Sequence, residues 1–267
     1  DRGSKARCTG DFAGDSRWPA CRRVLVGSVA GDSGVFGTAF IEGINLKTLV
    51  IVSHPDIEKS NTQQFLKASA ATLSQVAWHH LDVNLPFDVP AEQHAIQAAD
   101  RIVFQFPLYW YMAPASLHQW LTEVWLKQFV YDAHGGLLRG KSLGLVVSFS
   151  QPEAAYQLGG KVGFSLSQFL TPYVALAEKT SLDLLAPLTI SQFANQTDMA
   201  HQQLLVRYQQ YLTLVHPDDP DEQAQWYIDR LQANPETSIL ADQLAAQTDE
   251  IDRLRLTLHE LKAGESE

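Results

Sequence analysis

Short apolar stretches alternate with amphipathic ones through the middle of the chain, and this pattern predicts alternating strands and helices. The apolar stretches are mostly rich in β-branched residues, as expected of parallel strands that are buried on both faces. The amphipathic stretches repeat apolar residues every three or four positions, which predicts helices with one buried side. The expected strands cover residues 47–53, 76–81, 101–106, 141–149 and 182–191, and the expected helices cover residues 61–74, 91–99, 114–131, 163–179 and 197–215.

Strands joined by helices predict an α/β fold, a three-layer sandwich with a five-stranded parallel sheet between two layers of helices. The expected strand order is 2-1-3-4-5, and in that order the loops after the first, third and fourth strands converge, where open α/β sheets bind ligands. Pro187 should be tolerated in the fifth strand only near an edge or a bulge. The helix over residues 114–131 should bury Leu117, Leu121, Val124, Trp125 and Gln128.

Both ends of the chain differ from this middle part, which covers residues 46–215. Residues 1–45 contain eight of the sixteen glycines and both cysteines, Cys8 and Cys21, and they show no sustained periodicity. We interpret them as an extension outside the fold, either non-native or translated from upstream sequence, with the natural start near residues 44–46. A regulatory tail is the alternative. A signal peptide does not fit, because the early basic residues are followed by no continuous apolar core.

The last part, residues 216–267, begins with a punctuated acidic linker and a short expected helix over residues 222–233. Residues 237–262 then carry a heptad pattern with spacings of four and three. Two interpretations stay open: a helix docked on its own domain, or one that pairs through residues 235–262 with itself or with a partner. The heptad positions are Leu240, Leu244, Gln247, Ile251, Leu254, Leu258 and Leu261.

Composition narrows the class of protein. The 267 residues are 45% apolar and 19% charged, which supports a real core and argues against wholesale disorder. A net charge of −10 opposes binding to nucleic acid or to an anionic membrane surface. No apolar run approaches the ~20 residues that span a bilayer. The body has no cysteine, which suits a reducing cytoplasm, and no Cys/His spacing suits a zinc site.

The loop after the first strand contains His54 and, at the start of the next helix, the polar residues Ser60, Asn61 and Thr62. Their side chains, with the free N–H groups and the positive dipole of the helix end, suit a phosphate. The alternative is a plain helix cap, since such residues are common there. His54 could equally stabilise the turn as a hydrogen-bond donor.

The loop after the third strand is aromatic: Pro107, Leu108, Tyr109, Trp110 and Tyr111 precede a helix that Pro114 opens. Aromatic side chains at a ligand-binding edge suit a flat, largely apolar ring, and backbone N–H groups could meet its polar rim. Taken alone, the cluster could instead be a core plug or a dimer contact.

The segment from Phe106 to Pro114 resembles the FP-L-x-W-[YF]-x-x-P segment of the flavodoxin-like NAD(P)H:quinone oxidoreductases, and the resemblance covers roughly residues 46–215. It implies a flavodoxin-like fold and FMN as cofactor in preference to FAD. By this resemblance the phosphate binds at Ser60, Asn61 and Thr62, and His54 forms part of the first-loop wall. The flavin would contact Pro107, Leu108, Tyr109 and Trp110, with Tyr111 beside them.

The loop after the fourth strand departs from the family. Many members have Thr-Thr-Gly-Gly where this chain has Ser148, Phe149, Ser150 and Gln151. We still expect Ser148, Phe149 and Ser150 to contact the cofactor. Tyr156 stands at the position of a tyrosine that assists hydride transfer, whereas the histidine six residues later is replaced by Val162. Tyr156 is therefore the one candidate catalytic residue, with a surface aromatic as the alternative.

The function that this resemblance implies is hydride transfer from NADH or NADPH to quinones or similar small acceptors, by a ping-pong mechanism in a cytoplasmic homodimer. The alternative is a regulatory role, because some relatives are ancillary subunits of potassium-efflux systems. The C-terminal helix would then dock on the partner.

Overall fold

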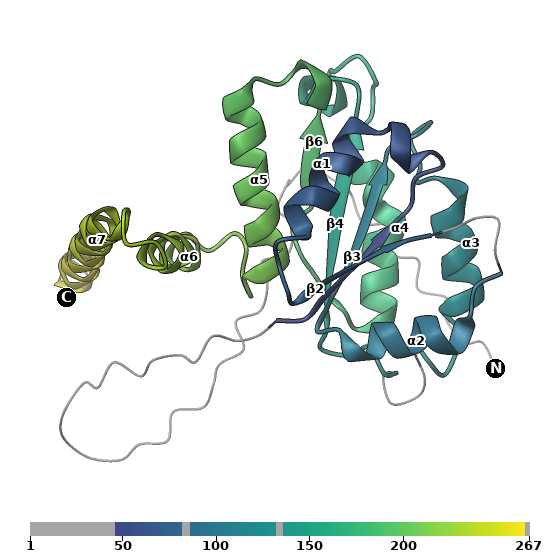
Figure 1. Ribbon diagram of the computed structural model, residues 1–267, viewed down its shortest axis with the longest axis horizontal. Helices are drawn as coiled ribbons and strands as arrows, with labels where there is room; N and C mark the ends of the chain where they lie inside the picture. The colour runs from purple at the N-terminus through teal and green to yellow at the C-terminus, as the bar shows by residue number, and fades with distance from the viewer. Residues whose placement is uncertain (1–45, 82–85, 132–135, 265–267) are drawn as a thin grey trace, which may run out of the picture. The chain divides into compact units, whose positions relative to one another are not determined.

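The computed structural model describes residues 46–81, 86–131 and 136–264, so the interpretation of residues 1–45 falls outside the described part. The parallel sheet has the order β2-β1-β3-β4-β5, with β6 also paired to β4 (Figure 1). This confirms the expected order. The strands are β1 (Thr48–Val52), β2 (Val76–His80), β3 (Arg101–Pro107), β4 (Ser142–Phe149), β5 (Asp183–Leu184) and β6 (Leu188–Ser191).

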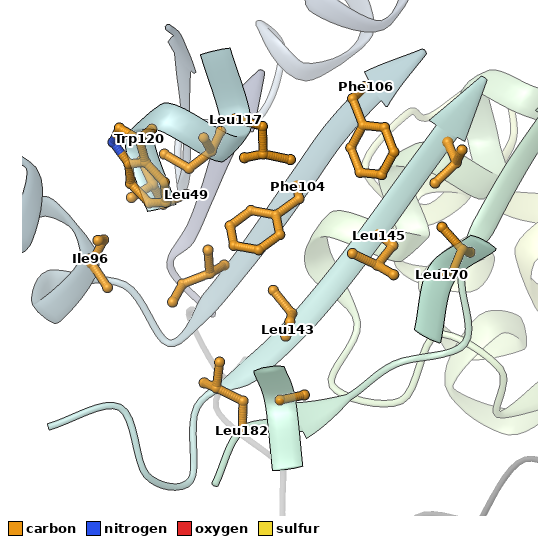
Figure 2. Close-up of a cluster of buried hydrophobic side chains, with 14 of the residues drawn as sticks. Leu49, Ile96, Phe104, Phe106, Leu117, Trp120, Leu143, Leu145, Leu170 and Leu182 are labelled. Carbon is orange, nitrogen blue, oxygen red and sulfur yellow. The ribbon is translucent and has the colours of Figure 1, made fainter. Parts of the chain in front are cut away.

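Helices cover both faces of the sheet, which explains why every position of β1 and β3 is buried. On β1, Val50 faces a cluster shared with Leu66 and Tyr208, from α1 (Asn61–Ala70) and α5 (Asp198–Thr213). Its neighbours on the strand point to the opposite face. That face packs on α2 (Val89–Ala98), α3 (Ala115–Val124) and α4 (Leu166–Thr180), and its core contains Leu49, Ile96, Phe104, Leu117, Trp120 and Leu170 (Figure 2).

The fifth expected strand is split around Pro187 into β5 and β6. Ser142 pairs with Asp183, but Val146 pairs with Leu188, so the outer strand carries one extra residue. This is a bulge, as expected for a proline that cannot donate a ladder hydrogen bond. Beside this bulge, the Tyr211 hydroxyl accepts the Leu145 N–H at 2.9 Å and donates to the Leu145 carbonyl at 3.4 Å. Gly144 makes this possible, because a Cβ there would meet the Tyr211 ring at 2.9 Å.

The helix expected over residues 114–131 ends at Val124, so the prediction that Gln128 lies on its buried stripe is wrong. The chain leaves the helix because Phe129 and Val130 turn into the core, where both are buried. Gln128 lies in this turn with a φ of +79° and donates its N–H to the Tyr131 carbonyl at 2.9 Å.

Arg101 joins the sheet to the end of α5. Its side chain is buried and donates to the carbonyl oxygens of Tyr211 and Val215, and its Nε donates to Ser142 Oγ at 3.1 Å. Burial lowers the pKa of Arg101 to about 10, which still leaves it charged at neutral pH. A buried cation thus neutralises the negative end of the α5 dipole.

Two helices follow α5, close to the predicted positions: α6 (Pro220–Gln232) and α7 (Ser238–Gly264). Trp226 on α6 donates its indole N–H to Thr213 Oγ1 at 3.1 Å, which ties α6 to the end of α5. Among the described helices, none is both long enough and apolar enough to cross a membrane.

Candidate functional site

The loops after β1, β3, β4 and β6 meet at the carboxyl edge of the sheet and enclose a cavity of about 320 Å³. That volume lies within the range of small-molecule sites. Nine residues predicted from the sequence line this cavity: His54, Ser60, Thr62, Pro107, Leu108, Tyr109, Ser148, Phe149 and Ser150. Four other predicted residues do not line the cavity, although each belongs to one of these loops or to the helix start beside it: Asn61, Trp110, Tyr111 and Tyr156.

The start of α1 supplies backbone donors to the cavity. Ser60 caps the helix, because its Oγ accepts the N–H of Gln63 at 3.3 Å. The N–H groups of Asn61 and Thr62 donate to no other residue within the described structure. With the positive end of the helix dipole behind them, these two N–H groups suit an anionic oxygen.

His54 connects the first two loops. Its Nδ1 accepts the N–H of Asp56 at 3.1 Å, and its Nε2 lies 3.1 Å from the hydroxyl of Tyr109. Since Nδ1 is an acceptor, the neutral ring carries its proton on Nε2 and donates it to Tyr109. Burial lowers the pKa of His54, and the charge of His80 lowers it further. The ring is therefore neutral at pH 7 and holds Tyr109 against the cavity.

The aromatic loop ends in a strained two-residue turn. Tyr109 and Met112 exchange both backbone hydrogen bonds, at 2.9 and 3.0 Å, and enclose Trp110 and Tyr111. These two residues have φ angles of +49° and +67°, in the region that Gly and Asn usually occupy in such turns. Each such residue costs on the order of 1–3 kcal/mol, and strain of this kind concentrates at functional sites.

The turn leaves the N–H groups of Trp110 and Tyr111 without an acceptor in the described part of the protein. The Trp110 side chain is 88% exposed, whereas Tyr111 stacks on Phe169 of α4 with ring centroids 4.9 Å apart. The turn therefore presents two backbone donors and one uncovered indole beside the cavity.

The loop after β4 buries its aromatic residues. The carbonyl of Ser148 accepts the N–H of Leu108 at 2.7 Å, which joins the second and third loops. Phe149 packs edge-on against Tyr156, with ring centroids 5.0 Å apart. The interpretation of Tyr156 as a surface aromatic is wrong, because its side chain is only 7% exposed and contacts Phe169 as well. Burial raises the pKa of Tyr156.

Sequence reasoning missed the fourth wall of the cavity, which follows β6. Gln192 adopts a left-handed backbone with a φ of +46° and donates its N–H to the Phe149 carbonyl at 2.9 Å. The only sequence signal was position, because the loop after the last strand reaches the same sheet edge. The missed residues are Ile190, Gln192, Phe193, Ala194 and Asn195.

The strand order and the site at its switch point define a flavodoxin-like α/β protein. The sequence profile of the family described as having a flavodoxin-like fold matches residues 46–212, and the chain belongs to this family.

Relatives and solved structures agree with this assignment. The NAD(P)H oxidoreductase YdeQ of Bacillus subtilis, itself uncharacterised, is 33% identical over 192 residues, which are 71% of this chain and 97% of that protein. The crystal structure of an NADPH-quinone reductase from P. pentosaceus matches with a TM-score of 0.61 and 42% identity, covering 64% of this chain and 99% of that one. The general stress protein 14 of Treponema denticola, solved in complex with FMN, matches with a TM-score of 0.57 and 32% identity, covering 62% and 97%.

Another relative has a different described role. The ancillary protein KefG of a glutathione-regulated potassium-efflux system, from an Enterobacter species, is 32% identical over 147 residues, covering 54% of this chain and 80% of KefG.

Proposed function

We propose that this protein is an FMN-dependent oxidoreductase that transfers hydride from NADH or NADPH to quinones or similar small acceptors. The observation that carries the proposal is the pair of free N–H groups at the start of α1, which lies on a cavity with aromatic and apolar walls. The FMN bound in the related general stress protein 14 and the name of the related quinone reductase support the choice of cofactor and reaction.

The residues present fit FMN. Its phosphate would accept hydrogen bonds from the N–H groups of Asn61 and Thr62 and from the Thr62 hydroxyl, and no lysine or arginine is among the residues that line the described cavity. Leu108, Tyr109 and Phe149 offer apolar surface to a flat ring. The free N–H groups of the Trp110–Tyr111 turn would donate hydrogen bonds to the polar rim of that ring.

FMN, when bound, supplies the hydride chemistry itself. The protein binds and orients: His54 keeps Tyr109 in place, and the strained turn keeps its two N–H groups fixed before any ligand arrives. Trp110 would cover the bound ring from the solvent side. The Tyr156 hydroxyl makes no hydrogen bond to a described residue, and we assign it the proton donation to a bound acceptor, although Tyr156 itself is not among the residues that line the cavity. The nicotinamide and the acceptor would use this one site in turn, which is a ping-pong scheme. The protein would act as a cytoplasmic homodimer.

The proposed phosphate site at the start of α1 can be tested by removing one backbone N–H group while keeping the helix. Proline is well tolerated at the first helical position, and Ser60 before it already has the extended backbone that proline requires. We expect Asn61→Pro to weaken FMN binding roughly tenfold, the value of one charge-assisted hydrogen bond, and to leave riboflavin binding unchanged. Fluorescence titration with both flavins measures this difference.

Asn61→Ala is the matched control, because it keeps the N–H group and removes only an exposed side chain. It should bind FMN as the wild type does. If the wild-type chain bound neither flavin, or if the protein loaded with FMN oxidised neither NADH nor NADPH with any quinone, the proposal would be wrong.

A second candidate function is that of an ancillary subunit of a potassium-efflux system, which the similarity to KefG favours. Cells that lack this protein should then lose glutathione-regulated potassium efflux, and the wild-type chain should restore it. Unchanged potassium efflux in cells that lack this protein would exclude this role.

A further inference from the structure

Helix α7 is covered by its neighbour on one side only. It has 27 residues, whereas α6, which packs against it, has 13. The covered side carries Ala241, which is fully buried, and Thr248, which is half-buried. Contact with α6 extends to Arg255, whose Nη1 meets both carboxylate oxygens of Asp221 at 2.7 and 2.8 Å. Because Asp221 lies in the first turn of α6, the rest of α7 continues past the end of α6.

Of the seven heptad residues, Leu244 is half-buried and the other six are exposed. Within the described part of the chain, Ile251, Leu254, Leu258 and Leu261 are each about half exposed, with values of 49 to 62%. Gln247 and Leu240 are exposed on the same stripe. A largely apolar stripe of this length on a helix is unfavourable in water and indicates a packing partner.

We propose that this stripe pairs with the same stripe of a second copy of the chain, as a parallel two-stranded coiled coil. In heptad terms, Ile251 is at position a, between two leucines at a, and three of the four d positions are leucine. At the Ile251 layer, isoleucine at a with leucine at d favours two strands.

The one polar residue of the stripe selects the parallel direction. In a parallel pair, Gln247 faces Gln247 of the partner subunit, and the two amides can donate to and accept from each other. In the antiparallel pair centred between Ile251 and Leu254, Gln247 would face a leucine and remain buried without a partner. Such a buried amide costs on the order of 1–3 kcal/mol.

The charges beside the stripe favour the same direction. Glu250 is at position g and Arg255 at the following position e, which are neighbours across a parallel pair. Glu250 would therefore meet Arg255 of the partner subunit, twice by symmetry. In the single chain both side chains are solvent-exposed, and Glu250 pairs with Arg253 at 3.3 Å. Arg255 meets Asp221 and Asp252 through Nη1 alone, so its other nitrogens can serve the contact with the partner subunit.

Disulfide trapping tests the pairing directly. In the full chain with Cys8 and Cys21 replaced by serine, Leu254→Cys should form a disulfide between copies under mild oxidation, because each d residue meets its own copy. Leu256→Cys is the matched control: it is also an exposed leucine of α7, but it lies off the stripe and should stay monomeric on a non-reducing gel. Equal trapping of both, or trapping of neither, would overturn the proposal. A disulfide that forms only between an Ile251→Cys chain and a Leu254→Cys chain would also overturn the proposal, since it indicates an antiparallel pair.

Sedimentation velocity gives a second, independent measurement. Leu254→Glu should weaken self-association at least tenfold, whereas Leu256→Glu should not, and both should keep the wild-type far-UV circular dichroism. Glu250→Arg should also weaken association, and Arg255→Glu added to it should restore part of the loss. If copies also meet through another face, Leu254→Glu should reduce the largest assembly to the next smaller one. An unchanged mass distribution would contradict the proposal, whatever the protein does with FMN.

Discussion

His54 and Tyr109 are joined by a hydrogen bond of 3.1 Å between the imidazole Nε2 and the phenol oxygen. The bond links the loop after β1 to the loop after β3 across the cavity. The opposite ring nitrogen accepts the Asp56 N–H, so the position of the proton is fixed by the backbone. One histidine thus fixes both the turn that follows β1 and the orientation of Tyr109.

This arrangement makes stability depend on pH. Burial lowers the pKa of His54, so the folded chain favours the neutral ring. The stabilisation is complete above the unfolded pKa of about 6.5 and is lost as the pH falls through the folded pKa. Urea unfolding at about pH 7.5 and about pH 5 should therefore show a larger loss of unfolding free energy in the wild type than in His54→Gln. Identical losses would mean that His54 is not held neutral.

Trp110→Asn should separate stability from binding. Asparagine adopts positive φ more readily than tryptophan, and the exposed indole gives up little packing, so we expect a gain of roughly 1 kcal/mol in unfolding free energy. If the indole covers the flavin, the same variant should bind FMN several-fold more weakly. Met112→Asn also removes an exposed apolar side chain, but not from a residue with positive φ, and should give no gain. Thermal unfolding and flavin titration measure the two effects, and a loss of stability in Trp110→Asn would contradict the strain argument.

Tyr156→Phe keeps the packing against Phe149 and removes only the hydroxyl. If that hydroxyl donates a proton to the acceptor, kcat for quinone reduction should fall at least about tenfold, while FMN affinity stays the same. Tyr131→Phe, a phenol outside the cavity, serves as the control. Stopped-flow measurement of the two half-reactions should place the loss in the oxidative half, and wild-type kcat in Tyr156→Phe would remove this residue from the mechanism.

Arg101→Met should be strongly destabilising. It leaves two carbonyl oxygens at the end of α5 without their charged donor, and a loss of about 3 kcal/mol in unfolding free energy is expected. Arg139→Met removes an exposed arginine and should change stability by less than about 0.5 kcal/mol. Urea unfolding compares the two, and equal effects would show that the buried guanidinium is dispensable.

The order of the sheet could be predicted from the sequence because buried parallel strands give short apolar runs that turn residues separate clearly. Residues at the ends of those runs could be placed at the cavity for the same reason, and seven of them line it, together with Ser60 and Thr62 from the start of the next helix. Pro187 marked the bulge because proline cannot donate in the ladder.

Other features depend on tertiary contacts that no local pattern encodes. The early end of α3 is imposed by the burial of Phe129 and Val130, and Gln128 matched a helical stripe by coincidence of spacing. The loop after β6 was missed because Gln192 and its neighbours carry no distinctive chemistry. The burial of Tyr156 results from the rings of Phe149 and Phe169, which the end of β4 and the helix α4 bring onto it from either side along the chain.

The donors at the start of α1 are fixed dipoles, and no mobile cationic side chain lines the cavity beside them. Attraction between freely exposed charges fades as ionic strength rises, whereas short contacts with oriented dipoles are screened far less. A phosphorylated cofactor retained in this way should be released only slowly into concentrated salt.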